Sequence, residues 1–137
     1  MKQNQKKGAK NQVGAYGEEI AVTYLQNKGF SILDTNYLKK WGEIDVIAKQ
    51  EGRVHFVEVK TVSYETKADL TSAVARGTYA PEEQVHASKL KKLSRVIETW
   101  IIEHEWEGEW QIDVAAVRIV PRETYATVKY IPNIIMD

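Results

Sequence analysis

Two short strings in the chain place two carboxylates and a lysine where they would suit metal-assisted chemistry on a phosphate. Asp45 lies in GEIDVIA (residues 42–48), and Glu58 and Lys60 lie in FVEVKT (residues 56–61). Mg²⁺ prefers hard oxygen ligands and is typically held by one or two carboxylates together with water and phosphate. A neighbouring lysine adds positive charge where a phosphodiester gains negative charge in its transition state. Asp45, Glu58 and Lys60 are therefore candidate catalytic residues.

The two strings are predicted to be neighbouring antiparallel strands. Residues 43–49 and 54–61 are rich in β-branched residues, and the Glu-Gly pair that ends at Gly52 is typical of a tight hairpin turn. A two-residue loop there fixes the register and sets Asp45 directly opposite Glu58. Opposed side chains have Cβ atoms about 4.5–5.5 Å apart, so the two carboxylates would repel unless a cation lay between them.

The same register sets Glu43 directly opposite Lys60. Because side chains alternate between the two faces of a strand, we expect Asp45, Glu58, Glu43 and Lys60 on one face. Val46, Val57 and Val59 then point to the other face, into the core. Glu43 has two interpretations that the sequence leaves open: it orients a metal ligand, or it forms a surface salt bridge with Lys60.

A helix predicted over residues 13–28 brings a further acid towards this pair. Its apolar residues share one face, and Gly29 is a typical helix stop. At about 100° per residue, Glu18 falls at the edge of that face, whereas Glu19 falls on the solvent side. Glu18 therefore points along the boundary of the core, where it can approach the acid pair.

The remaining pattern predicts an α/β fold. Strands are expected at 30–38, 43–49, 54–61, 110–119 and 126–131, a second long helix at 84–104, and a partly helical excursion at 63–83. The order αβββ–α–ββ indicates a mixed β-sheet flanked by helices. We expect residues 1–12 to form a flexible basic arm and residues 13–137 a single domain.

Composition excludes several classes of protein. The 137 residues include no cysteine, which excludes disulfides and thiolate metal sites, and no apolar run reaches the roughly 18 residues of a membrane span. The polar N-terminus lacks the apolar stretch of a signal peptide, so a cytoplasmic location is expected. No glycine-rich phosphate loop is present, so no nucleotide cofactor is expected.

The charge is zero overall but unevenly distributed. Residues 1–12 carry four lysines and no acid, and residues 85–97 carry a second acid-free group, namely Lys89, Lys91, Lys92 and Arg95. Such groups bind nucleic-acid backbones, but they are equally typical of a solvated helix face. Lys89 either contacts the scissile phosphate or lies at a helix edge with its amine in water. Gln84 serves either as a polar site residue or as a helix cap.

Three motifs together resemble a known family. GAYGE (residues 14–18), GEIDVIA and FVEVKT are similar to the YraN-like family of small bacterial proteins, and the resemblance covers about residues 13–131. It implies the restriction-endonuclease-like fold of the PD-(D/E)XK superfamily, near the Holliday-junction resolvases. Asp45 and Glu58 match that superfamily's metal-binding acids, Lys60 its catalytic lysine, and Glu18 the helical glutamate of resolvases. Many relatives have an arginine where this chain has Val62.

The resemblance leads us to expect a metal-dependent endonuclease. It would use Mg²⁺ or Mn²⁺ to hydrolyse phosphodiester bonds in structured or branched DNA rather than RNA. A homodimer is compatible with this activity, since resolvases act as symmetric dimers on symmetric junctions. Two alternatives remain open: a nucleic-acid-binding protein without turnover, and an interaction module with the same fold.

Overall fold

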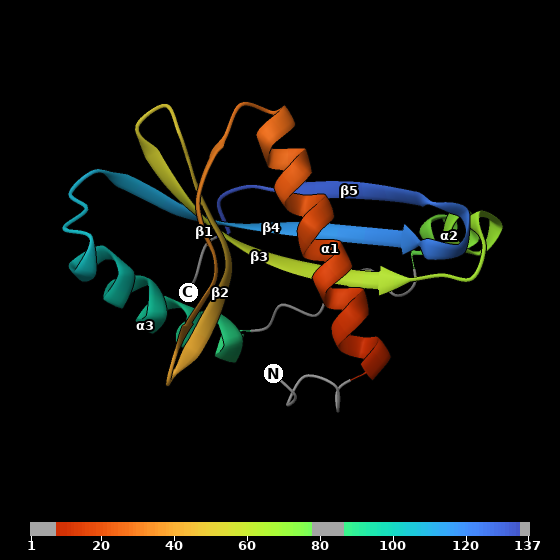
Figure 1. The fold of residues 1–137 in the computed structure, drawn as a ribbon, viewed down its shortest axis with the longest axis horizontal. Coiled ribbons are helices and arrows are strands. Elements are labelled where there is room, and N and C mark those ends of the chain that lie inside the picture. The colour runs from red at the N-terminus through yellow and green to blue at the C-terminus, as the bar shows by residue number, and fades with distance from the viewer. Residues whose placement is uncertain (1–7, 78–86, 135–137) are drawn as a thin grey trace.

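The computed structural model describes residues 8–77 and 87–134, which form a mixed sheet with helices on both faces (Figure 1). Helix α1 (Gly8–Asn27) is followed by strands β1 (Ser31–Lys39), β2 (Gly42–Gln50) and β3 (Arg53–Ser63). Helices α2 (Lys67–Arg76) and α3 (Ala87–Glu103) come next, and the chain ends with β4 (Glu109–Val120), the short 3₁₀ helix η3 (Pro121–Glu123) and β5 (Tyr125–Ile131). The predicted α/β class and element order are confirmed, with α2 as the helical part of the predicted excursion.

The sheet has five strands in the order β1-β2-β3-β4-β5. The neighbouring strands are antiparallel except β3 and β4, which are parallel and therefore need the long connection through α2 and α3. That parallel pair lies at the centre, and nine residues at the end of β4 are continuously buried. Burial on both faces is what a near-continuous apolar strand predicts.

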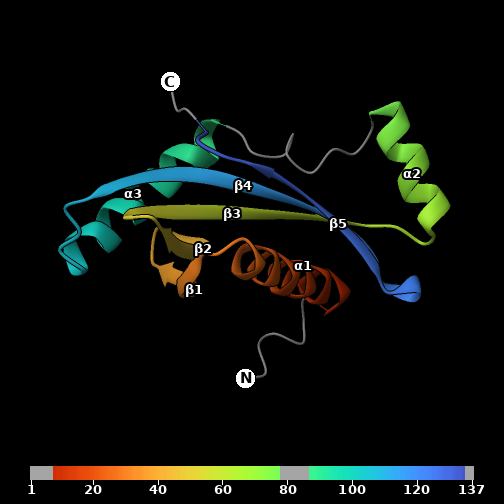
Figure 2. The same cartoon turned by 90° about the horizontal axis from the view of Figure 1, so that it is seen from above.

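The two faces of the sheet are covered by different helices. Ala21 and Leu25 of α1 pack on one face with Val46, Val57 and Val59 of β2 and β3 and with the second half of β4. On the other face, Leu93, Ile97 and Trp100 of α3 pack against β1, β2 and the first half of β3. Figure 2 shows α1 on one side of the sheet and α2 and α3 on the other. No helix within the described ranges is long and apolar enough to cross a membrane.

The first helix begins earlier than its apolar pattern predicts. It starts at Gly8 rather than at residue 13, because a helix needs no apolar face where its residues are adequate helix formers, and Lys, Gln and Ala are among the better ones. The predicted basic arm otherwise falls on residues 1–7, which lie outside the described residues. Glu18 is half-buried and Glu19 exposed, as the helical projection predicts.

Candidate metal centre at a fork in the sheet

The hairpin register is confirmed, but it stops just before the predicted acid pair. β2 and β3 pair from Gln50–Arg53 to Val46–Val57 and no further. Beyond Val46, β2 remains paired with β1 as far as its start at Gly42, whereas β3 continues beside β4 to Ser63. Figure 1 shows β1 and β2 turning away from β3, which runs on with β4 and β5. The sheet therefore forks at the position of Asp45 and Glu58.

The Asp45 side chain links the two strands where they separate at this fork. Its Oδ2 accepts a hydrogen bond from the backbone N–H of Val59 at 2.7 Å. That N–H would otherwise lack a strand partner, since β2 no longer runs beside it. The Asp45 carboxylate thus joins the two diverging strands by a side-chain bond where the backbone ladder ends.

The fork also twists β2 and corrects the predicted strand partner of Glu43. Ile44 and Ile47 both belong to the cluster under α3, although strict alternation would put residues three apart on opposite faces. β2 therefore twists between them, where it loses β3 as a partner and remains paired with β1. For the same reason Glu43 pairs with Leu38 of β1, and is not the strand partner of Lys60.

Glu18 reaches the fork because α1 lies unusually close to β3. Gly17 is buried, and a Cβ at that position would overlap the side chain of Thr61. The helix backbone can therefore approach the strand, and the next residue, Glu18, lies near Asp45, Glu43 and Glu58.

Asn36 is a residue of the site that the sequence did not single out. Its Nδ2 donates to Glu18 Oε1 at 2.8 Å and to Glu43 Oε2 at 3.1 Å, so it bridges the helix and the second strand. Its backbone has φ 51°, a left-handed conformation that asparagine tolerates better than most residues. Asn36 and Tyr37 also resemble the YraN-like pattern, and that resemblance is the signal that could have singled out Asn36.

Burial and neighbouring negative charge act together on the acids. Loss of hydration raises the pKa of Asp45, the charge of Glu58 raises it further, and the Val59 hydrogen bond opposes both, which leaves a pKa of about 8. The pKa of Glu18 is also raised, chiefly by burial, although hydrogen bonds with Asn36 and Asp45 oppose the rise. Without a cation, the fork therefore retains a proton near neutral pH, and opposite charge would favour its loss.

Glu58 and Lys60 form the β3 side of the fork. Glu58 is 2% exposed, and its Oε2 lies 3.6 Å from the Nζ of Lys60, whose side chain is about one-fifth exposed. The lysine charge compensates a carboxylate that has left water, while its amine remains within reach of solvent. These two residues are brought together as the sequence predicts.

The predicted basic residues lie in part beyond the described chain. Lys91, Lys92 and Arg95 are exposed on α3, and the Arg95 guanidinium lies 4.9 Å from the centre of the Trp41 ring at the β1–β2 turn. Gln84 lies outside the described residues, and so does the side chain of Lys89. The basic surface that can be described therefore runs from α3 to the tip of the β1–β2 hairpin.

The acidic side chains at the fork are of the kind that binds a hard divalent cation. Glu18, Asp45 and Glu58 offer carboxylate oxygens from three elements, and their mutual repulsion is what a cation would relieve. In the conformation seen for residues 8–77 and 87–134, no three acidic or histidine side chains are close enough together to hold a metal ion. Binding therefore requires side-chain rotation at the fork.

Comparison with known sequences places this site within a family. The model of UPF0102, described as an uncharacterised protein family, matches residues 17–117. A UPF0102 protein of Alkaliphilus oremlandii is 38% identical over 114 residues, which are 81% of this chain and 88% of that protein. One of Campylobacter lari is 35% identical over 104 residues, 76% of this chain and 81% of that protein. The chain belongs to the UPF0102 (YraN) family.

The family match includes the whole fork. The segment matched by UPF0102 begins at Gly17, beside Glu18, and ends within β4, so it contains Asp45, Glu58 and Lys60. A UPF0102 protein of Flavobacterium psychrophilum is 34% identical over 107 residues, 78% of this chain and 81% of that protein. UPF0102 membership is consistent with the PD-(D/E)XK superfamily to which the sequence motifs point.

Proposed function

We propose that this UPF0102 protein is a metal-dependent endonuclease that hydrolyses phosphodiester bonds in structured or branched DNA. The observation that carries the proposal is the fork, where two strands separate and Glu18, Asp45, Glu58 and Lys60 converge from α1, β2 and β3. A core sheet gains no stability from gathering acids beside the buried Glu58 and its partner Lys60, so the arrangement favours a ligand-binding role.

The residues at the fork have different proposed roles in the reaction. Asp45 and Glu58, with Glu18, would hold Mg²⁺ or Mn²⁺, which when bound lowers the pKa of water and neutralises phosphate charge. Lys60 is placed to stabilise negative charge on the scissile phosphate, because its amine is at the fork and partly exposed. Asn36 holds Glu18 and Glu43 in position, and the Val59 N–H fixes one oxygen of Asp45.

One observation favours a second candidate, a nucleic-acid-binding protein without turnover. Each acid at the fork is already held by an internal partner: Glu18 by Asn36, Asp45 by Val59, and Glu58 by Lys60. A site satisfied in this way is stable without metal and would leave the basic surface of α3 as the functional part.

A cleavage screen separates the two functions. Purified protein is incubated with labelled duplex, single-stranded, flap and four-way-junction DNA, with Mg²⁺ or Mn²⁺ and with EDTA, beside Asp45→Asn. The nuclease predicts metal-dependent cleavage of at least one branched substrate and none by Asp45→Asn, because that variant removes a metal-binding charge and keeps the size of the side chain.

Asp34→Asn is the matched control, since Asp34 is exposed and bonds only the next backbone N–H among the described contacts. It should cleave like the wild type. If the wild-type protein binds these substrates but cleaves none of them with either metal, the nuclease proposal is wrong and the non-catalytic binding function takes its place.

A further inference from the structure

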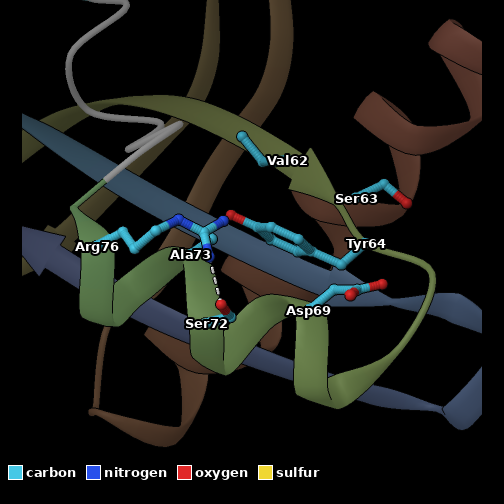
Figure 3. Close-up of a pocket in the computed structure, with 7 residues that line it drawn as sticks. All are labelled: Val62, Ser63, Tyr64, Asp69, Ser72, Ala73 and Arg76. Carbon is cyan, nitrogen blue, oxygen red and sulfur yellow. Dashed lines mark hydrogen bonds between the residues drawn. The ribbon is translucent and has the colours of Figure 1, made fainter.

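A pocket of about 460 Å³ opens between the end of β3 and α2, beyond the fork. Figure 3 shows Val62 and Tyr64 on the β3 side and Asp69, Ser72 and Arg76 on the α2 side. Its volume lies in the range of small-molecule sites, which combine apolar walls with a few placed polar groups. None of these residues belongs to the candidate metal centre.

Two arginine side chains point to the hydroxyl end of the Tyr64 ring, Arg118 from β4 and Arg76 from α2. Arg118 of β4 is only 8% exposed, and its Nε donates to the Tyr64 hydroxyl at 3.3 Å. Arg76 reaches along the pocket to the same end of the ring and donates to the Ser72 hydroxyl (Figure 3). Within residues 8–77 and 87–134, neither arginine has a carboxylate at ion-pair distance. The buried charge of Arg118 and the exposed charge of Arg76 therefore favour an anionic ligand at this end of the pocket.

The pocket lies next to the fork along β3, because Lys60 of the fork and Val62 of the pocket belong to the same strand. Lys60 and Val62 are two residues apart on β3, so their side chains share a face and their Cα atoms are about 7 Å apart. Arg118 is the strand partner of Val62, as Ala116 is of Lys60. A nucleic-acid strand with one phosphate at Lys60 would therefore bring its next nucleotide to the pocket.

We propose that this pocket binds an unpaired nucleotide next to the scissile phosphate. Arg76 binds the phosphate of that nucleotide, Arg118 adds positive charge at the Tyr64 hydroxyl, and the base lies on the Tyr64 ring. Asp69, at the far end of the pocket, accepts from an amino group of the base. The proposal rests on the proposed nuclease function and deepens it: the substrate strand must be single-stranded beside the cleaved bond.

The chemistry of the walls favours a nucleotide over a free phosphate or an acidic peptide. Two arginines beside an aromatic face match an anion joined to a flat ring, because guanidinium binds phosphate oxygens and a tyrosine ring stacks on a base. A base within a duplex cannot lie on Tyr64 while it is stacked and paired. The pocket therefore selects flaps, gaps and junction branches against continuous duplex.

Binding measured without metal tests the proposal apart from catalysis. Fluorescence anisotropy in EDTA compares a labelled single-stranded oligonucleotide with the same sequence as duplex. Stacking of one base is worth roughly 1–3 kcal/mol, so Tyr64→Ala should weaken single-strand binding roughly 5- to 150-fold, while duplex binding changes less than about threefold. Tyr64→Phe keeps the ring and should bind the single strand within about threefold of wild type.

Arg76→Ala tests the phosphate contact at an exposed position where the fold is not at risk. Loss of one contact should flatten the slope of log affinity against log salt for the single strand by about 0.7. Arg122→Ala is the matched control, since Arg122 is exposed, pairs with Glu65 and does not line the pocket. It should leave the slope unchanged.

The outcomes separate the pocket from the nuclease. If Tyr64→Ala and Arg76→Ala bind the single strand like wild type, or lose single-strand and duplex affinity equally, the pocket proposal is wrong even where wild type cleaves DNA. If the single-strand affinity alone falls and wild type cleaves nothing, the pocket stands and the nuclease is wrong. Circular dichroism of each folded variant excludes unfolding as the cause.

Discussion

Gly17 of α1 and Thr61 of β3 leave no room for a side chain between them. A Cβ at position 17 would lie 1.9 Å from the Thr61 Oγ1 and 2.8 Å from its Cβ and Cγ2. The contact sets how deeply the helix lies on the sheet, one residue before Glu18. The distance between helix and strand therefore determines how closely Glu18 can approach the acids of β2 and β3.

We predict that Gly17→Ala destabilises the protein by about 1–3 kcal/mol, because an overpacked core must shift its backbone. The shift moves Glu18 away from Asp45, so any Mn²⁺ affinity that depends on Glu18 should fall as well. Urea denaturation measures the first effect and calorimetric titration with Mn²⁺ the second.

Gly14→Ala provides the matched control in the same helix. A Cβ at Gly14 meets nothing within 4 Å, so alanine there should stabilise the helix by roughly 0.5–1 kcal/mol. Thr61→Ala should recover part of the loss in the Gly17→Ala background, since it removes two of the three overlapping atoms. Equal stability of the Gly14 and Gly17 variants would contradict the close packing of α1 on β3.

The raised pKa of Asp45 predicts a pH dependence of stability in metal-free protein. The unfolded chain releases this proton near pH 3.8, whereas the folded chain keeps it to about pH 8. Between these values the folded state binds more protons, so the free energy of unfolding should fall as pH rises and level off above pH 8. Asp45→Asn cannot ionise, yet its amide oxygen can still accept from Val59.

We therefore expect Asp45→Asn to be more stable than wild type at pH 8 in EDTA, by about 1–3 kcal/mol, with the difference vanishing towards pH 4. Urea denaturation across this range measures it. The exposed Asp34 provides the control substitution to asparagine, which should follow the wild-type curve. If the free energy of unfolding of the wild type rises from pH 5 to pH 8, the pKa of Asp45 is not raised by the fork.

The fold could be predicted because its elements repeat simple patterns. Period-two alternation and a Glu-Gly turn gave the β2–β3 register correctly from Val46 to Gln50. The fork could not be found this way, since no residue type in either strand marks the position where β2 and β3 stop pairing. The fork is defined by strand pairing in three dimensions, because beyond Val46 β2 pairs only with β1, while β3 continues to pair with β4.

The contacts that position the site are equally invisible in the sequence. Asn36 joins Glu18 and Glu43 because β1 folds beside α1, and no local pattern encodes that meeting. The same holds for His55, whose Nδ1 lies 2.7 Å from Oδ2 of the buried Asp113 in the parallel strand β4. Residue type identifies candidate acids, whereas long-range packing decides which of them meet.

Metal binding should depend on both acids of the fork and be weak without DNA. Protein carboxylates alone rarely complete the shell of Mg²⁺, and at this fork they must first rotate away from internal partners. Calorimetry with Mn²⁺ should show binding by wild type and none by Asp45→Ala with Glu58→Ala. Equal binding by the double variant would locate the metal elsewhere.

The exposed cations of α3 should contribute separately to DNA affinity. Neutralising Lys91, Lys92 and Arg95 together should flatten the slope of log affinity against log salt for duplex DNA by up to about 2.7, since each lost phosphate contact contributes about 0.9. Neutralising Lys28, Lys49 and Arg122, which are exposed on other elements, is the control. Identical slopes for the two triple variants would mean that α3 is only a solvated surface.

Lys60 distinguishes catalysis from binding at the fork. Lys60→Ala leaves Asp45 and Glu58 in place but removes the charge beside the scissile phosphate, and one such contact is worth roughly 10²–10³ in rate at other active sites. We expect single-turnover cleavage of a junction or flap to slow by that factor, while DNA affinity in EDTA changes less than about threefold. Lys60→Arg, which keeps the charge, should recover part of the rate. If Lys60→Ala cleaves as fast as wild type, the lysine only neutralises the buried Glu58, and the transition state is stabilised by other groups.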